Sequence, residues 1–141
     1  MTNHLIFIFY LLIFLISTIG FGYLFSSFFF KDFRTLNFGY QGIIGFFTIC
    51  LISIFTSFFF PHNFIHNTLL HLSGTAIFFW NFFKNTKDNI IQIKKLAFLF
   101  LILAIGVYVF KNHDDFPYYH LTYALNLSQN SFMIGTGIFS H

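Results

Sequence analysis

The sequence predicts an all-α polytopic membrane protein with four transmembrane helices and one amphipathic helix on the outer surface. Three observations predict this fold. Hydrophobic residues make up 57% of the chain and charged residues 8%, whereas a soluble domain carries roughly a quarter charged residues. The apolar residues fall into four runs separated by polar breaks, and the basic residues cluster in alternate breaks. A chain this apolar cannot cover its own surface with polar groups, so we expect a bilayer around it.

The first two apolar runs are the longest. The first, residues 5–30, can cross a hydrocarbon core of about 30 Å even when tilted. No lysine or arginine precedes it, so it is not typical of a cleaved signal peptide. The second run covers residues 38–60. Within it Gly39, Gly42 and Gly45 recur at three-residue spacing, which predicts a strip of small residues where another helix packs closely.

The third and fourth runs are shorter. Residues 61–67 separate the second run from the third, residues 68–83, and Pro61 suits both the end of one helix and the first turn of the next. Trp80 lies where an anchor at the membrane surface is expected. The fourth run, residues 96–110, would extend only about 22 Å as a helix. Its flanking lysines must therefore reach to the membrane surface to complete the span.

The basic residues predict the orientation, because cytoplasmic loops keep an excess of Lys and Arg. Six of the seven lie in the breaks after the first and third runs, and only Lys111 lies on the other side. We therefore expect a multi-pass membrane protein with these two breaks in the cytoplasm. Both termini of the chain, the turn 61–67 and the segment after the fourth run are expected outside the cytoplasm. All seven histidines then lie at or near the outer face.

A short helix, residues 117–130, is expected to follow the fourth run. It is too short and too polar to span, and its apolar residues share one face, which is typical of a helix lying along the membrane surface. The chain then ends without a cap or a polar tail. We therefore expect a single membrane domain, residues 1–141, that belongs to a longer protein.

An acidic pair just before this helix is the strongest candidate site. Asp114 and Asp115 are two of the four acidic residues in the chain, and placing them near a membrane is costly unless they have a use. One could act as a general base and the other bind an acceptor or a divalent metal, with His113 and His120 as further nitrogen ligands. The alternative is that Asp115 only caps the helix and Asp114 is solvated.

This outer loop also carries a resemblance. Its sequence HDDFPYYHL, together with PHNFIHN in the turn 61–67, resembles uncharacterised multi-span bacterial inner-membrane proteins loosely related to the GT-C superfamily of glycosyltransferases. The resemblance implies the N-terminal portion of a glycosyltransferase-like protein that acts on the extracytoplasmic face with a polyprenyl-phosphate sugar donor, in some members with a divalent metal. In that superfamily the acidic loop follows the first helix, whereas here it follows the fourth.

Carried over to this chain, the resemblance implies a role for each residue of the motif. The catalytic residues would be Asp114 and Asp115, and the metal ligands would be the same two aspartates and His120. The residues expected to bind substrate are His113, Tyr118, Tyr119 and His120. Four spans and a surface helix would not enclose both a lipid donor and an acceptor, so we expect this chain to be inactive alone.

Other functions stay open or are disfavoured. The chain could be a non-enzymatic integral membrane subunit or a polysaccharide-export partner. A transporter is less favoured, because ionisable residues are nearly absent from the runs, and nucleic-acid binding is excluded because no basic stretch interleaved with aromatics exists. His62 and His66 have a spacing that metal sites use. Hydrogen-bonded interfacial histidines, or packing of the turn under the acidic loop, are the alternatives.

Overall fold

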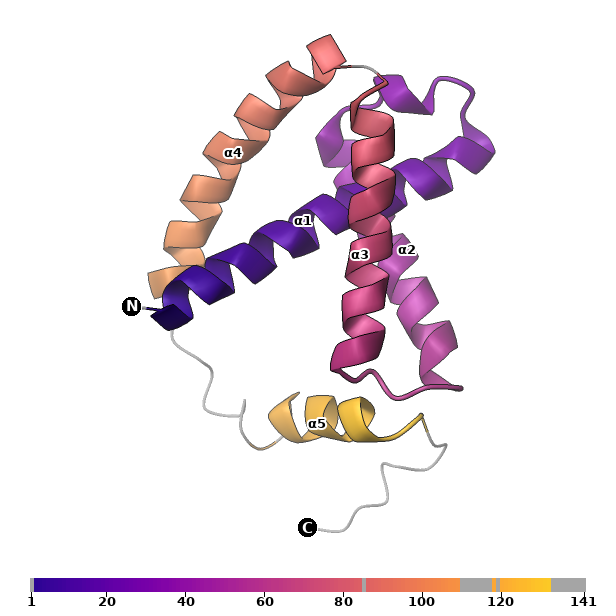
Figure 1. The fold of residues 1–141 in the computed structure, drawn as a ribbon, viewed down its shortest axis with the longest axis vertical. Coiled ribbons are helices and arrows are strands. Elements are labelled where there is room, and N and C mark those ends of the chain that lie inside the picture. The colour runs from indigo at the N-terminus through magenta and orange to yellow at the C-terminus, as the bar shows by residue number, and fades with distance from the viewer. Residues whose placement is uncertain (1, 85, 110–117, 119, 133–141) are drawn as a thin grey trace.

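The computed structural model describes residues 2–84, 86–109, 118 and 120–132. Within these residues all regular structure is helical (Figure 1), so the all-α prediction is confirmed for this part of the chain. The elements are α1 (Thr2–Phe29), the short 3-10 helix η1 (Phe33–Thr35), α2 (Phe38–Ser57), α3 (Phe64–Phe82), α4 (Thr86–Val109) and α5 (Leu121–Gln129).

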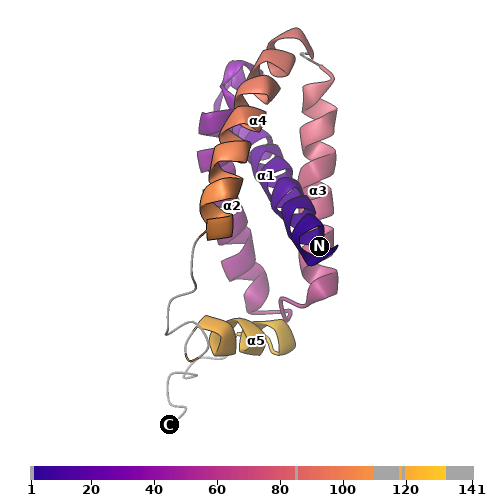
Figure 2. The same ribbon diagram turned by 90° about the vertical axis from the view of Figure 1, so that its left-hand side faces the viewer.

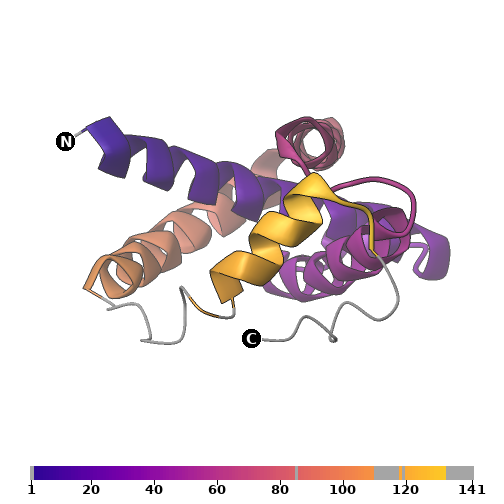
Figure 3. The same cartoon turned by 90° about the horizontal axis from the view of Figure 1, so that it is seen from below.

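Helix α1 is the centre of the fold and packs against both α2 and α3. It crosses them obliquely, and α4 runs along another side (Figures 1 and 2). The α2–α3 turn and α5 lie at one end of the molecule, while η1 and the α3–α4 turn lie at the other (Figures 1 and 2). Seen from below, α5 lies across its end of the bundle (Figure 3). Successive connections thus alternate between the two ends.

Glycines allow α1 to approach its neighbours until the backbones touch. A Cβ atom built on Gly20 would overlap the main chain of Gly74 in α3, and one built on Gly22 would overlap the main chain of α2. From the other side, a Cβ atom on Gly45 would overlap the carbonyl group of Thr18. Close backbone approach at small residues is the packing that apolar helices use where the hydrophobic effect between them is weak.

The predicted glycine strip of α2 is wrong at two of its three positions. Only Gly45 lies at a helix contact. A Cβ atom on Gly42 would have nothing within 4 Å, and one on Gly39 would meet only the Asn37 side chain, at 3.2 Å. The reason is geometric, because three residues fall about 60° short of a full helical turn and two such steps rotate Gly39 well away from the face of Gly45.

Buried polar side chains join the helices where the apolar core is small. That core contains Ile19 and Tyr23 of α1, Phe38 of α2 and Phe78 of α3. Beside it, the fully buried Gln41 links three elements, since α2 carries it while its partners lie in α1 and η1. Hydrogen bonds between helices are expected to hold such a bundle together when few apolar side chains are buried.

Helix α4 begins at Thr86, ten residues before the apolar run that predicted it. Its polar first half is helical because it serves the neighbouring helix ends. Gln92 Oε1 accepts a hydrogen bond from the Phe38 main-chain N–H at 2.6 Å, and Asn89 Nδ2 donates to the Phe82 carbonyl at 2.9 Å. Main-chain N–H groups at the start of a helix and carbonyl groups at its end otherwise lack hydrogen-bond partners. With 24 residues, α4 is about 36 Å long, but Lys94 and Lys95 lie within it, so its apolar part is no longer than the run that predicted it.

The other boundaries also differ from the apolar runs. Helix α2 ends at Ser57 rather than near residue 60, and α3 begins at Phe64, four residues earlier than expected. The early start follows from a cap, because Asn63 Oδ1 accepts a hydrogen bond from the His66 main-chain N–H at 3.0 Å. Helix α5 lies within the expected 117–130 segment and has no buried residue. Residues 118 and 120 just before it are also helical, whereas 117 and 119 lie outside the described residues.

The outer surface of the described bundle is strongly apolar. Large side chains on all four long helices are exposed, among them Phe28 at 75%, Phe55 at 66% and Phe98 at 68%. Two helices, Leu5–Phe29 within α1 and Phe38–Ser57, are long and apolar enough to cross a membrane by length and composition. The expectation of four spans is not confirmed by this criterion and stays a prediction.

Candidate functional site

Two histidines of the α2–α3 turn stack on each other at the end of the bundle that α5 crosses. His62 lies just before α3 and His66 lies in its first turn. Their ring centroids are 4.4 Å apart and their planes are inclined by only 10°. The Asn63 cap starts α3 between them, so the chain reverses direction and brings the two rings face to face.

A set of hydrogen bonds connects this pair to Thr56 and Asn67. Asn67 Nδ2 donates to the His62 carbonyl at 3.0 Å, so Asn67 Oδ1 is free to accept from His66 Nδ1 at 3.3 Å. Thr56 Oγ1 lies 3.1 Å from His66 Nε2 and 3.2 Å from His62 Nε2, so both rings bond to the same hydroxyl. The hydroxyl also donates to the Ser53 carbonyl at 3.3 Å.

The same turn holds α5 in place. The His62 main-chain N–H donates to the Leu127 carbonyl at 2.7 Å, and the Phe132 N–H donates to the Ser57 carbonyl at 2.6 Å. The rings of Phe132 and Phe58 pack edge to face at 5.2 Å. Two main-chain hydrogen bonds and one aromatic contact therefore attach α5 and the residues after it to the end of the α2–α3 hairpin.

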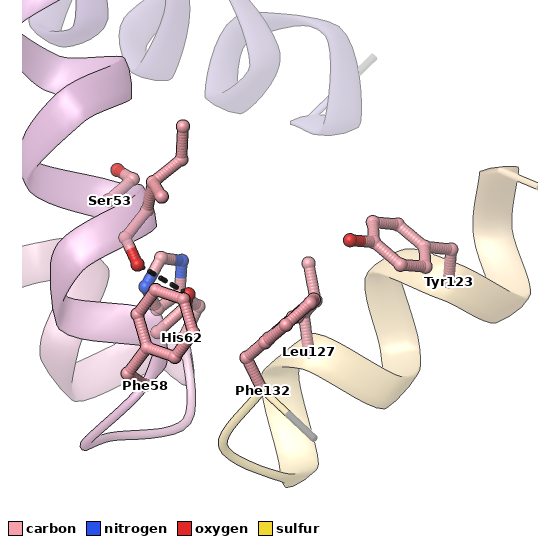
Figure 4. A pocket seen from close by; sticks show the side chains of 8 residues that line it. Ser53, Phe58, His62, Tyr123, Leu127 and Phe132 are labelled. Atoms are coloured by element: carbon pink, nitrogen blue, oxygen red, sulfur yellow. Dashed lines mark hydrogen bonds between the residues drawn. The ribbon is translucent and has the colours of Figure 1, made fainter. Parts of the chain in front are cut away.

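A cavity of about 210 Å³ lies between α5 and the hairpin. Its polar lining comes from Ser53, Ser57 and His62 on the hairpin and from Tyr123 on α5, and the apolar lining includes Leu127. The Tyr123 hydroxyl points across the cavity toward α2 (Figure 4). Hydroxyls and an imidazole facing a small apolar cavity are suited to binding a polar group such as a sugar hydroxyl.

Lowering the pH is expected to loosen α5. Burial of the ring, and next the neighbouring His66, lower the pKa of His62 below its ordinary value of 6.5, against a smaller opposite effect of the Ser53 carbonyl. The folded state therefore binds the proton less readily than the unfolded turn. The contribution of His62 to stability is complete above pH 6.5 and is lost as the pH falls through the lowered pKa. Hydrogen-exchange protection of the His62 and Phe132 amides should fall accordingly.

The exposed His120 at the start of α5 provides the control for this experiment. His62→Gln should abolish the pH dependence of the protection, while His120→Gln should leave it intact. Protection that is constant between pH 7 and pH 5 in the unmodified protein would contradict the role given to His62.

The structure brings together few of the residues that the sequence singled out. His113, Asp114, Asp115 and Tyr119 lie outside the described residues. Tyr118 and His120 are described and both are exposed. The His120 side chain makes no capping hydrogen bond to α5.

No group of three or more His, Cys, Asp or Glu side chains that could hold a metal ion occurs among the described residues. The stacked rings of His62 and His66 are nearly parallel, and two parallel imidazoles cannot both direct an in-plane lone pair at one ion. His71 lies away from them, with Nδ1 2.8 Å from Ser17 Oγ in α1. The histidine turn is therefore a hydrogen-bonded network in this structure.

The sequence did not indicate several polar members of this site, namely Ser53, Thr56, Ser57 and Tyr123. Thr56 lies inside an apolar run and Tyr123 lies some sixty residues along the chain, so no local spacing relates them to the histidines. A polar residue in the last turn of an apolar run was the one available signal for Thr56. Comparison of the chain with protein-family models, curated proteins and solved structures finds no match.

Proposed function

We propose that this chain is part of a membrane glycosyltransferase-like protein that transfers a sugar from a polyprenyl-phosphate donor on the extracytoplasmic face. The observation that carries the proposal is the attachment of α5 to the α2–α3 turn. This attachment holds the residues that follow the acidic loop against a cavity lined by His62, Tyr123 and two serines. A sugar acceptor needs such hydroxyl and imidazole partners beside a carboxylate base.

The proposal includes a four-span arrangement in the bacterial inner membrane, with α5 and the α2–α3 turn outside the cytoplasm. The exposed apolar side chains of the long helices support a bilayer location, since an apolar surface of this extent is not stable in water. The alternation of the connections between the two ends supports the orientation. The end with η1 then carries the excess of basic residues that cytoplasmic loops keep.

The chemistry assigned to the acidic pair follows from the needs of the reaction. One aspartate, Asp114 or Asp115, accepts the proton of the acceptor hydroxyl, and the other binds the acceptor. A divalent ion held by these two residues and His120 would supply charge to neutralise the leaving phosphate. Of these ligands only His120 is described, and its exposed imidazole, with no capping hydrogen bond, is available for coordination. Tyr118 is also exposed and available to a substrate.

Of Asp114→Asn and Asp115→Asn, the substitution that removes the general base is expected to lower sugar transfer by about 100-fold. The other substitution is expected to lower it by weakening acceptor binding. The assay uses membranes that carry the protein as it occurs in the cell, a radiolabelled polyprenyl-phosphate hexose, and release of polyprenyl phosphate as the readout. Asp32→Asn is the matched control. Asp32 is exposed and its side chain does not cap η1, which lies at the opposite end.

A non-enzymatic membrane subunit or polysaccharide-export partner is the second function that an observation favours. The glycine contacts between α1 and its neighbours make a rigid unit, and its apolar exterior could receive further helices. If both aspartate variants transfer sugar as well as the Asp32→Asn control, the glycosyltransferase proposal is refuted. The subunit function would then stand.

A further inference from the structure

A second cavity lies at the opposite end of the bundle, between α1, η1 and α3, and it contains the one arginine of the chain. Its volume is about 640 Å³. Its polar lining comes from Tyr23 and Ser27 of α1, Arg34 of η1, and Trp80 and Asn81 of α3, and the rest includes aliphatic side chains. The cavity is open to the surface close to the basic end of the molecule, where phosphate groups of a bilayer would lie.

The Arg34 side chain is half-buried and held in one orientation. Its Nε donates to Asn81 Oδ1 at 3.2 Å, and its Cζ lies 4.6 Å from the centroid of the Phe33 ring. Asn81 is fixed in turn, because its Nδ2 donates to the Ile77 carbonyl at 3.0 Å. Arg34 makes no ion pair within the described part of the chain. The two Nη groups therefore remain as a preorganised fork for an anion.

The Tyr23 hydroxyl is a buried polar group that lacks a hydrogen-bond partner. The residue is only 1% exposed, and its hydroxyl makes no hydrogen bond within the described residues. Tyr23 and Arg34 line the same cavity. A buried hydroxyl that lacks a partner destabilises the folded state. An acceptor that enters the cavity beside Arg34 would remove this destabilisation.

The rim of the cavity selects against a cationic headgroup. Lys84 Nζ lies 4.6 Å from the Trp80 ring centroid, so a lysine already occupies the aromatic face that a choline group would need. Two positive charges, Arg34 and Lys84, therefore lie near the opening. The aliphatic part of the lining, together with the exposed apolar surface of α1 and α3, suits hydrocarbon chains and not a free, fully hydrated ion.

We propose that this cavity binds the phosphate of an anionic membrane phospholipid, with Arg34 as the charged partner and the Tyr23 hydroxyl as a second donor. Asn81 positions the guanidinium, and the lipid chains lie along the exposed surface of α1 and α3. This site is distinct from the proposed catalytic cavity, which lies at the α5 end, and it does not depend on sugar transfer.

Trp80 makes the site directly measurable, because it is the only tryptophan in the chain and it lines the cavity. The protein is placed in nanodiscs of mixed phosphatidylglycerol and phosphatidylcholine, with bromine on the chains of one lipid or the other, and quenching of Trp80 fluorescence is measured. The quenching should show that the fraction of phosphatidylglycerol beside Trp80 is enriched about 10-fold relative to its fraction in the whole disc. A charge-assisted hydrogen bond is expected to produce an enrichment of this size.

Arg34→Gln should remove this enrichment, whereas Lys31→Gln, an equal charge change at an exposed residue of the same connection, should preserve it. Tyr23→Phe removes only the unpaired hydroxyl, so it should fold at least as well in pure phosphatidylcholine yet reduce the enrichment about 3-fold. The exposed Tyr40 gives the matched control, Tyr40→Phe, which should change neither quantity.

Three results would overturn the proposal. The first is equal quenching by the two brominated lipids in the unmodified protein. The second is equal loss of enrichment in Arg34→Gln and Lys31→Gln, which would indicate general attraction to basic charge. The third is loss of the enrichment when inorganic phosphate, but not an equal ionic strength of chloride, is added, since the site would then bind free phosphate. Should Arg34→Gln fail to fold, Tyr23→Phe and Tyr40→Phe decide the question.

Discussion

Replacing Gly45 by leucine is expected to separate α2 from α1 and to lower the free energy of unfolding by roughly 3 kcal/mol or more. Even the Cβ atom of the new side chain would overlap the Thr18 carbonyl group and approach the main-chain N of Gly22 at 2.7 Å. Both neighbours are backbone atoms of α1, so they cannot move unless the whole helix moves. Unfolding in mixed micelles with increasing dodecyl sulfate measures the change.

Gly42→Leu is the control for this prediction, because it makes the same substitution one turn away in the same helix. A Cβ atom on Gly42 meets nothing within 4 Å, and leucine has the higher helix propensity at both positions. We therefore expect Gly42→Leu to leave stability unchanged or to raise it slightly. Equal destabilisation by the two variants would contradict the packing of α2 on α1.

Hydropathy could predict the existence of the long helices, because that signal is local. The apolar runs at residues 5–30 and 38–60 correspond to α1 and α2 with small differences at the ends. The start of α4 could not be predicted in this way. Seven of its first ten residues are polar or charged. Asn89 and Gln92 among them bond to the ends of α3 and α2, and hydropathy does not detect such contacts.

The helix contacts and the site were harder to predict, because they depend on which faces of the helices meet in the folded chain. Spacing alone suggested three glycines of α2, but a contact also depends on which face meets the neighbour, and only Gly45 lies on that face. Likewise the sequence pointed to His62 and His66 but not to Thr56, whose hydroxyl lies between them. Thr56 meets the two histidines only because the chain reverses direction at Asn63. The packing of α2 and α3 contributes to this reversal, so spacing in the sequence alone could not predict the contact.

Gln41→Leu is expected to lower the free energy of unfolding by about 3 kcal/mol, because the lost side chain joins three elements. Its Nε2 donates to the Phe33 carbonyl at 2.6 Å, and its Oε1 accepts from Ser26 Oγ at 3.0 Å. Leucine has a similar volume, so the cost comes from buried polar groups that lose their partner. The same micelle unfolding measures this change, and Gln129→Leu at the exposed end of α5 should be neutral.

A variant of Ser26 tests the Ser26–Gln41 hydrogen bond separately from the bond between Gln41 and the Phe33 carbonyl. Ser26→Ala removes only the hydrogen bond to Gln41 and should cost about 1 kcal/mol, and adding it to Gln41→Leu should cost little more, since the shared bond is already lost. Ser27→Ala, at an exposed serine that bonds only within α1, should have no effect. Strictly additive costs for Ser26→Ala and Gln41→Leu would mean that the two side chains do not interact.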